Sequence, residues 1–164
     1  MKTLDVVDQN VLSAYNKGSE QEREFLKRLF PNQDFNQKIT DRVKTYEDAC
    51  EIKGIQPMSI GQFNIFPESQ REYLFCLHQD DIINEVLNEG WEADFSKGDA
   101  KNYPYFYWDV EKAGGPGFSY YDCICDCSNS YVGARRTFKT PELAKYSGTQ
   151  FLHIHSVIHS KRTK

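Results

Sequence analysis

Three cysteines occupy alternate positions of one short run, at Cys123, Cys125 and Cys127. Alternate residues of a β-strand share a face, so the three thiols would line one side of a sheet. Thiolates are ligands that zinc prefers, but zinc knuckles use a C-x2-C turn, which this run lacks. Neighbouring thiols on one strand face are about 6.5–7 Å apart, too far for a disulfide. We therefore favour thiols that pack as small apolar residues, with a metal site as the alternative.

Two histidines near the C-terminus, His155 and His159, have the i, i+4 spacing that places two ligands on one helical face. The third histidine of this run, His153, falls on another face. No H-E-x-x-H glutamate accompanies them to act as a base. A solvated helix edge therefore explains the pair better than a metal site does.

Acidic residues give a third arrangement with possible chemistry, because Asp109, Asp122 and Asp126 fall on expected strands. Carboxylates clustered on a sheet could hold magnesium. Their spacing matches no nuclease pattern, and charges on edge strands commonly resist aggregation. The sequence also contains no phosphate-binding glycine loop and no nucleophile motif. We expect no bound cofactor.

Basic and aromatic side chains gather towards the C-terminus. Arg135, Arg136 and Lys139 stand near Tyr131 and Phe138, and three more basic residues follow: Lys161, Arg162 and Lys164. Such a mixture could bind single-stranded nucleic acid by stacking and phosphate contact. The whole chain, however, has a net charge of −4, which disfavours nucleic acid as the partner.

The length and composition indicate one folded domain. The chain has 164 residues, of which 14% are aromatic, a composition that argues against disorder. Its start has no apolar signal segment, and no apolar run approaches the roughly 20 residues that span a bilayer. Its five Cys are an odd number. We therefore expect a cytoplasmic protein with reduced thiols and no membrane partner.

One long helix, over residues 66–91, is the element around which the rest is organised. Pro67 suits its first position, an apolar stripe runs along it, and Gly90 provides the stop. Ahead of it, two short helices joined at Gly18 predict an N-terminal hairpin over residues 1–36. This hairpin either docks on the core domain, residues 37–164, or moves as an appendage. A further short helix begins after Thr45.

Beyond the long helix, aromatic residues predict strands at 105–110, 118–127 and 131–138, with turns between them. These make a three-stranded antiparallel meander. Thr140, Pro141 and Glu142 then open one final helix. The expected fold class is α+β, with its core formed by twelve residues: Leu74, Phe75, Ile82, Ile83, Val86, Trp91, Phe106, Trp108, Phe138, Leu143, Phe151 and Ile154.

Four blocks in this order carry a family resemblance: TYEDACEIKGI, DIINEVLNEGWEADFS, KNYPYFYW and VGARRTFKTPELAKYSGTQF. They resemble a family of small uncharacterised proteins of bacteria, phages and prophages. That family shows T-[FY]-E-D-A-C, L-N-E-G-W, Y-P-[WY]-F and F-K-[ST]-x-E-L-A-x-Y-x-G-x-Q-F. The likeness spans residues 39–160 and implies an origin, because the family has no established activity to transfer. The Cys123–Cys127 run is not part of the likeness.

The family blocks also predict a binding site. Trp91, Tyr103, Tyr105 and Arg135 come from three elements that could meet at one end of the sheet, giving aromatic walls and a fixed cation. The alternative is a structural corner in which Arg135 pairs with Glu89 or Asp94. The function most in keeping with the sequence is a non-enzymatic binding or accessory protein of phage or mobile-element origin, with a protein partner. A metal-dependent enzyme and a nucleic-acid-binding protein remain the alternatives.

Overall fold

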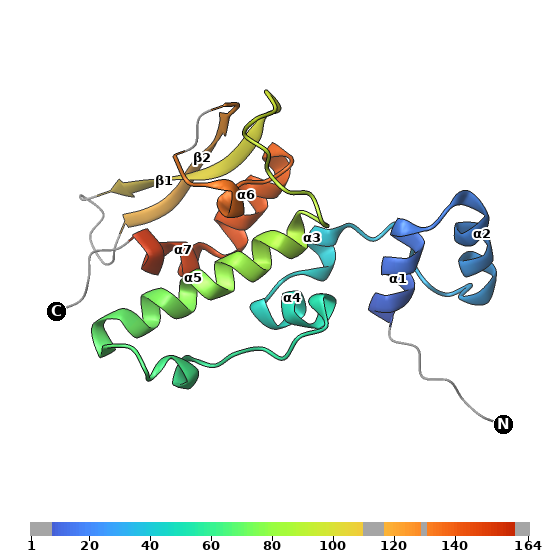
Figure 1. Cartoon of the computed structure of the whole chain (residues 1–164), viewed down its shortest axis with the longest axis horizontal. Helices are drawn as coiled ribbons and strands as arrows, with labels where there is room; N and C mark the ends of the chain where they lie inside the picture. The colour runs from blue at the N-terminus through green and yellow to red at the C-terminus, as the bar shows by residue number, and fades with distance from the viewer. Residues whose placement is uncertain (1–7, 110–116, 129–130, 160–164) are drawn as a thin grey trace.

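The computed structural model describes residues 8–109, 117–128 and 131–159. Its elements are α1 (Asp8–Lys17), α2 (Glu20–Leu29), α3 (Ile39–Arg42), α4 (Tyr46–Lys53), η1 (Ile60–Phe63), α5 (Glu68–Leu87), β1 (Lys101–Asp109), β2 (Gly117–Asp126), η2 (Ala134–Arg136), α6 (Pro141–Gln150) and α7 (Leu152–His159). The expected α+β class is confirmed. Figure 1 shows α5 in the middle of the core, with α4 below it and the β-hairpin above it.

The main core lies where α4, α6 and α7 meet α5. Seven of the twelve expected core residues are buried: Ile82, Ile83, Val86, Phe138, Leu143, Phe151 and Ile154. Four others are only half-buried: Leu74, Phe75, Trp91 and Phe106. Trp108 is 41% exposed, so its assignment to the core was wrong. It lies opposite Phe118, near the end of β1.

The helix ends follow local sequence signals. Ser19 with Glu22 and Thr45 with Asp48 form reciprocal capping boxes at the starts of α2 and α4. The side chain of Thr140 caps α6, with a proline in its first turn. After α5 the chain turns through Gly90, whose φ of 83° is a conformation that favours glycine. These caps account for most of the helix boundaries that the sequence predicted.

The two strands form an antiparallel hairpin in which Lys101 lies opposite Asp126 and Asp109 opposite Gly117. The register shifts between Tyr105 and Phe106 and skips Tyr121, which is a bulge in β2. Helix α6 packs across this hairpin. An added Cβ at Gly148 would lie only 2.5 Å from Tyr120 and 2.7 Å from Pro104, so glycine sets this close approach.

The prediction of a third strand over residues 131–138 was wrong. Within the described residues the sheet has two strands, and this segment contains the short turn η2 and a single bridge from Phe138 to Asn102. The reason lies in α5, whose asparagines bond the backbone here. Asn88 donates Nδ2 to the Thr137 carbonyl oxygen at 2.8 Å and accepts from the Lys139 N–H at 3.0 Å. A neighbouring strand would otherwise use these groups.

The prediction of one final helix was also wrong, because this part of the chain forms two helices, α6 and α7. Phe151, between α6 and α7, has φ −106° and ψ 30°, which leaves helical geometry. Its side chain is buried in the core. The break redirects α7 so that it lies against α5. This contact brings His155 next to Asp80.

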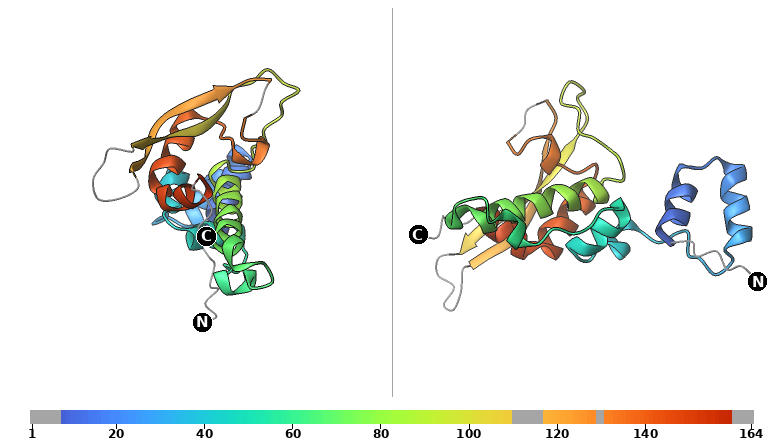
Figure 2. Two further views of the ribbon diagram at one scale, coloured as in Figure 1. Left: turned by 90° about the vertical axis from the view of Figure 1, so that its left-hand side faces the viewer. Right: turned by 60° about the horizontal axis from the view of Figure 1, so that its bottom comes forward.

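The N-terminal hairpin has a small core of its own. Helices α1 and α2 enclose Val11, Leu12 and Phe35, around which Tyr15, Leu26 and Phe30 pack. The main core begins at Ile39, so the two clusters fall on either side of residue 37. Figure 2 shows the α1–α2 pair beside the main core, reached through the chain that leads into α3.

Candidate functional site

Aromatic side chains of the hairpin line a cavity of about 540 Å³. We call it the aromatic hollow. It is defined chiefly by six residues: Tyr103, Tyr105, Phe106, Trp108, Phe118 and His159. Tyr131 and Val132 of the segment after β2 also line it. The hollow therefore lies where the hairpin, α7 and this segment come together.

Both faces of β1 contribute to the hollow. Along a strand, Tyr103 and Tyr105 point opposite to Phe106 and Trp108, yet all four line the same cavity. Phe118 and Ile124 of β2 also line the cavity, so both strands of the hairpin contribute to the hollow. Phe106 stacks on Phe118 with ring centroids 4.8 Å apart, which fixes the inner wall.

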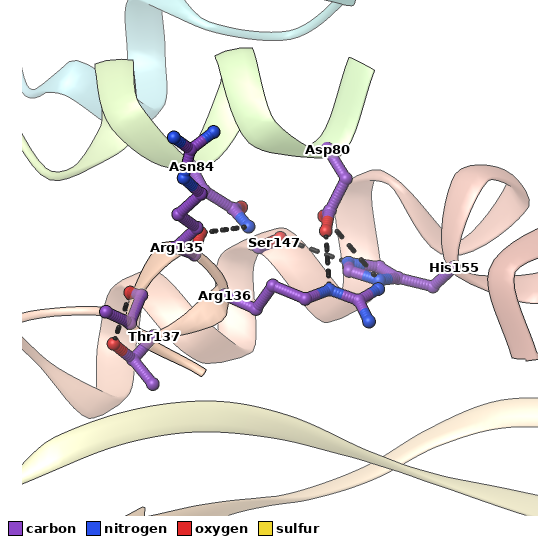
Figure 3. Close-up of polar contacts among 8 residues, drawn as sticks. Asp80, Asn84, Arg135, Arg136, Thr137, Ser147 and His155 are labelled. Atoms are coloured by element: carbon purple, nitrogen blue, oxygen red, sulfur yellow. Dashed lines mark hydrogen bonds and ion pairs between the residues drawn. The ribbon is translucent and has the colours of Figure 1, made fainter. Parts of the chain in front are cut away.

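A buried polar network lies behind this wall, where four elements meet (Figure 3). Asp80 of α5 accepts from Arg136 Nε at 3.1 Å. Its other oxygen, Oδ1, lies 3.9 Å from His155 Nδ1. On the far side of the imidazole, His155 Nε2 lies 3.1 Å from Ser147 Oγ of α6. The aspartate, serine and histidine are all buried.

Burial governs the protonation of this network. Removal from water raises the pKa of Asp80, while the Arg136 guanidinium opposes that rise. Burial lowers the pKa of His155 to about 3, and the positive charge of Arg136 acts in the same direction. The pKa of His159 is also lowered by burial and by Arg136. Both imidazoles are therefore neutral at pH 7.

The order Asp80–His155–Ser147 is that of a carboxylate, an imidazole and a hydroxyl, as in serine hydrolases. Two observations separate it from such a site. Ser147 is 0% exposed, so its hydroxyl does not reach a substrate. The 3.9 Å gap between Asp80 and His155 also exceeds a hydrogen bond. The network therefore supports the fold and the floor of the hollow.

The four residues expected to form one binding site are divided between two cavities. Tyr103 and Tyr105 line the aromatic hollow. Trp91 and Arg135 line a second cavity of about 380 Å³ beside the C-terminal end of α5. Arg135 is largely exposed and bonds to Asp81 Oδ2 at 3.0 Å, in place of the expected Glu89 or Asp94.

The two acids expected to pair with Arg135, Glu89 and Asp94, pair with lysines instead. Glu89 pairs with Lys139 at 2.8 Å, and Asp94 pairs with Lys97 at 3.3 Å. Both acids therefore already have cationic partners within reach.

The three cysteines of the Cys123–Cys127 run lie on β2 and just beyond its end. Cys123 is half-buried and packs against the main core, and burial raises the pKa of its thiol. Cys125 and Cys127 are exposed. Among the described residues, no group of three or more His, Cys, Asp or Glu is placed to hold a metal ion. His155 and His159 lie side by side as expected, with ring centroids 6.5 Å apart, and both rings contact Phe106 of the hairpin. The expected solvated helix edge was wrong for His155, because packing against the hairpin and α5 buries its imidazole.

The acidic and basic residues singled out in the sequence are dispersed. Asp122 is exposed, and Asp126 accepts from the Tyr131 N–H at 3.3 Å. Arg136 belongs to the buried network. The side chain of Asp109 and the basic residues Lys161, Arg162 and Lys164 lie outside the described residues.

No protein-family model, no curated protein and no solved structure matches this chain. The resemblance to small bacterial and phage proteins therefore stays a prediction from the four sequence blocks. Among the described residues, no helix is long and apolar enough to cross a membrane.

Proposed function

We propose that this chain is a non-enzymatic binding protein whose aromatic hollow takes a flat, apolar ligand group. The sequence blocks extend the proposal to an accessory protein of phage or mobile-element origin. The observation that supports it is the hollow itself: about 540 Å³ lined by aromatic side chains from both faces of β1. Ligand sites typically have volumes of roughly 300–1,000 Å³, with apolar walls and few polar groups.

The position of Trp108 favours binding over a purely structural role. It is 41% exposed at the rim of the hollow, although it packs against Phe118 at 5.1 Å between centroids. A residue that served the core alone would have its indole covered. Exposed aromatic rings of this kind offer contact area at low cost in conformational entropy.

The enzymatic alternative has less support. The described acids, thiols and imidazoles do not converge into a metal-binding group. The one arrangement with catalytic order, Asp80–His155–Ser147, has its hydroxyl sealed in the core. An enzyme would need an accessible nucleophile or base within reach of the substrate.

The chain's two Trp provide a direct test, because each lines a different cavity. Two-dimensional NMR of ¹⁵N-labelled protein resolves their indole N–H signals, which Trp91→Phe and Trp108→Phe assign. Titration with 2-naphthol, a soluble flat ring compound, should shift the Trp108 signal and leave the Trp91 signal in place. A shift of Trp91 alone, or of neither signal, would contradict the proposal.

Matched variants sharpen this test. Trp108→Ala removes part of the wall and should weaken 2-naphthol binding by about tenfold, the effect of losing one good apolar contact. Trp91→Ala should leave the dissociation constant unchanged. Circular dichroism confirms that both variants are folded before they are compared.

A further inference from the structure

A smaller inner cavity lies directly behind the aromatic hollow. It has a volume of about 30 Å³ and is lined by Asp80, Asn84 and His155 of the buried region. Five of its lining residues, Phe106 and His159 among them, also line the hollow. The two cavities therefore share one wall. A group the size of one water needs about 10–15 Å³, so the inner cavity accommodates one.

Two residues that line this inner cavity each have a buried polar atom with no hydrogen-bond partner among the described residues: Asn84 Oδ1 and His155 Nδ1. Their residues are 1% and 3% exposed. Buried polar atoms in folded proteins nearly always have a partner. Both side chains are held from their other ends, since Asn84 Nδ2 donates to the Arg135 carbonyl oxygen and His155 Nε2 contacts Ser147 Oγ.

The chemistry of these two atoms restricts what fits between them. Asn84 Oδ1 only accepts, so it needs a donor. His155 Nδ1 donates or accepts according to its tautomer, and the Asp80 carboxylate oxygen 3.9 Å away favours a hydrogen on Nδ1. A hydroxyl group donates its one hydrogen to Asn84 Oδ1 while its oxygen accepts from the Nδ1 hydrogen of His155, so in this tautomer it serves both atoms.

A neutral group suits the inner cavity better than an ion. Asp80 is already paired with Arg136 at 3.1 Å, so the two charges nearest the cavity compensate each other. Burial keeps the imidazole of His155 neutral by lowering its pKa. An added carboxylate or ammonium would be a buried charge without a partner, which is costly.

We propose that the ligand of the aromatic hollow is a flat ring compound carrying a hydroxyl group, and that this hydroxyl bonds to Asn84 Oδ1 and His155 Nδ1. The inference rests on the proposed function and adds the class of ligand. The distance to be crossed is short, because the ring of Phe106 lines both cavities and lies 4.8 Å from the imidazole of His155. The proposal requires that this one ring shift from its stack on Phe118, or that the hydroxyl pass beside it.

The test compares 2-naphthol with 2-fluoronaphthalene, in which fluorine replaces the hydroxyl at nearly the same size and cannot donate. Both are titrated against the full chain, followed by the Trp108 indole signal. The ratio of the two dissociation constants is measured in the parent and in Asn84→Leu. The preference of the protein for 2-naphthol over 2-fluoronaphthalene should be about tenfold smaller in Asn84→Leu than in the parent, because the variant loses one or two hydrogen bonds to the hydroxyl.

A second measurement needs no variant, in case Asn84→Leu fails to fold. The ¹⁵N signals of the imidazole of His155 in the parent should shift with saturating 2-naphthol and stay in place with 2-fluoronaphthalene. Equal affinity ratios in parent and variant, or equal imidazole shifts with the two compounds, would overturn the hydroxyl inference. Binding in the hollow would then still stand. If neither compound moves the Trp108 signal, the proposed function itself is wrong.

Discussion

Asp80 and His155 approach each other from two helices, α5 and α7, with Oδ1 and Nδ1 3.9 Å apart. Arg136 holds the other oxygen of the same carboxylate at 3.1 Å, so three separate elements converge on Asp80. This convergence lies beneath the aromatic hollow and fixes its floor.

Breaking the ion pair between Asp80 and Arg136 should lower the free energy of unfolding far more than breaking the exposed pair between Asp81 and Arg135. The side chain of Asp80 is 4% exposed, so Asp80→Ala leaves a guanidinium without a partner against the core. We expect a loss of about 3–5 kcal/mol in the free energy of unfolding, measured by urea denaturation.

The chain offers a matched control one residue further on. Asp81 pairs with Arg135, whose side chain is 83% exposed. Asp81→Ala should therefore cost about 1 kcal/mol or less. Equal losses in the two variants would show that the Asp80 pair does not hold the elements together.

The buried imidazole of His155 should make stability depend on pH. Its folded-state pKa of about 3 lies below the ordinary value of 6.5, so the unfolded chain binds the extra proton first as the pH falls. The free energy of unfolding should be full above pH 6.5 and decline by about 1.4 kcal/mol per pH unit below it. The lowered pKa of His159 adds to this slope, whereas the raised pKa of Asp80 opposes it.

Urea midpoints between pH 8 and pH 5 measure this effect, above the range in which ordinary carboxylates titrate. His155→Gln should be less stable at pH 8 but show a clearly shallower decline. His153 is exposed, so His153→Gln serves as the control and should keep the parent slope. A parent-like slope in His155→Gln would mean that the imidazole does not govern the response.

Much of the helical fold could be predicted from the sequence because its signals are local. Capping residues, Pro141 and Gly90 act within one turn of the chain, and they fixed helix ends correctly. The split at Phe151 and the missing third strand depend on contacts with α5, which local patterns do not contain. Strand propensity at residues 131–138 was overridden by these tertiary bonds.

The buried network was missed for a related reason. Asp80, Asn84 and Asn88 lie mostly off the apolar stripe of the long helix, yet all three are buried. Their spacing of four residues gives one continuous row along the helix, beside the apolar stripe. The sequence therefore contained a signal for a polar row along the helix. It did not show that Arg136, far away in the chain, pairs with Asp80 of this row. Of the four residues expected to form one binding site, Tyr103 and Tyr105 line the hollow, whereas Phe106 and Trp108, which also line it, were expected in the core.

Thiol reactivity should divide the five Cys into three groups. Cys50 and Cys76 are buried out of reach of a reagent, and burial also raises the pKa of Cys76 to about 11. Cys125 and Cys127 are exposed. We expect rapid labelling by a thiol reagent at these two positions, slower labelling at Cys123, and labelling of the others only on unfolding.

Mass spectrometry of peptides after timed labelling checks this order. The double variant Cys125→Ser with Cys127→Ser should lose the rapid phase and retain the stability of the parent. Rapid labelling of Cys76 in the folded protein would contradict the placement of α5 in the core.

Gly148 provides the sharpest test of how α6 packs on the hairpin. An alanine Cβ there would lie 2.5 Å from Tyr120 and 2.7 Å from Pro104, inside van der Waals contact with a ring and a proline on neighbouring strands. Overpacking of this kind costs about 1–3 kcal/mol, which exceeds the gain of up to about 1 kcal/mol from better helix propensity.

Gly98→Ala is the control, because nothing lies within 4 Å of its added Cβ and its φ imposes no strain. Thermal or urea unfolding should show a clear loss for Gly148→Ala and a change within about 0.5 kcal/mol for Gly98→Ala. A more stable Gly148→Ala would mean that α6 and the hairpin are further apart than this contact requires.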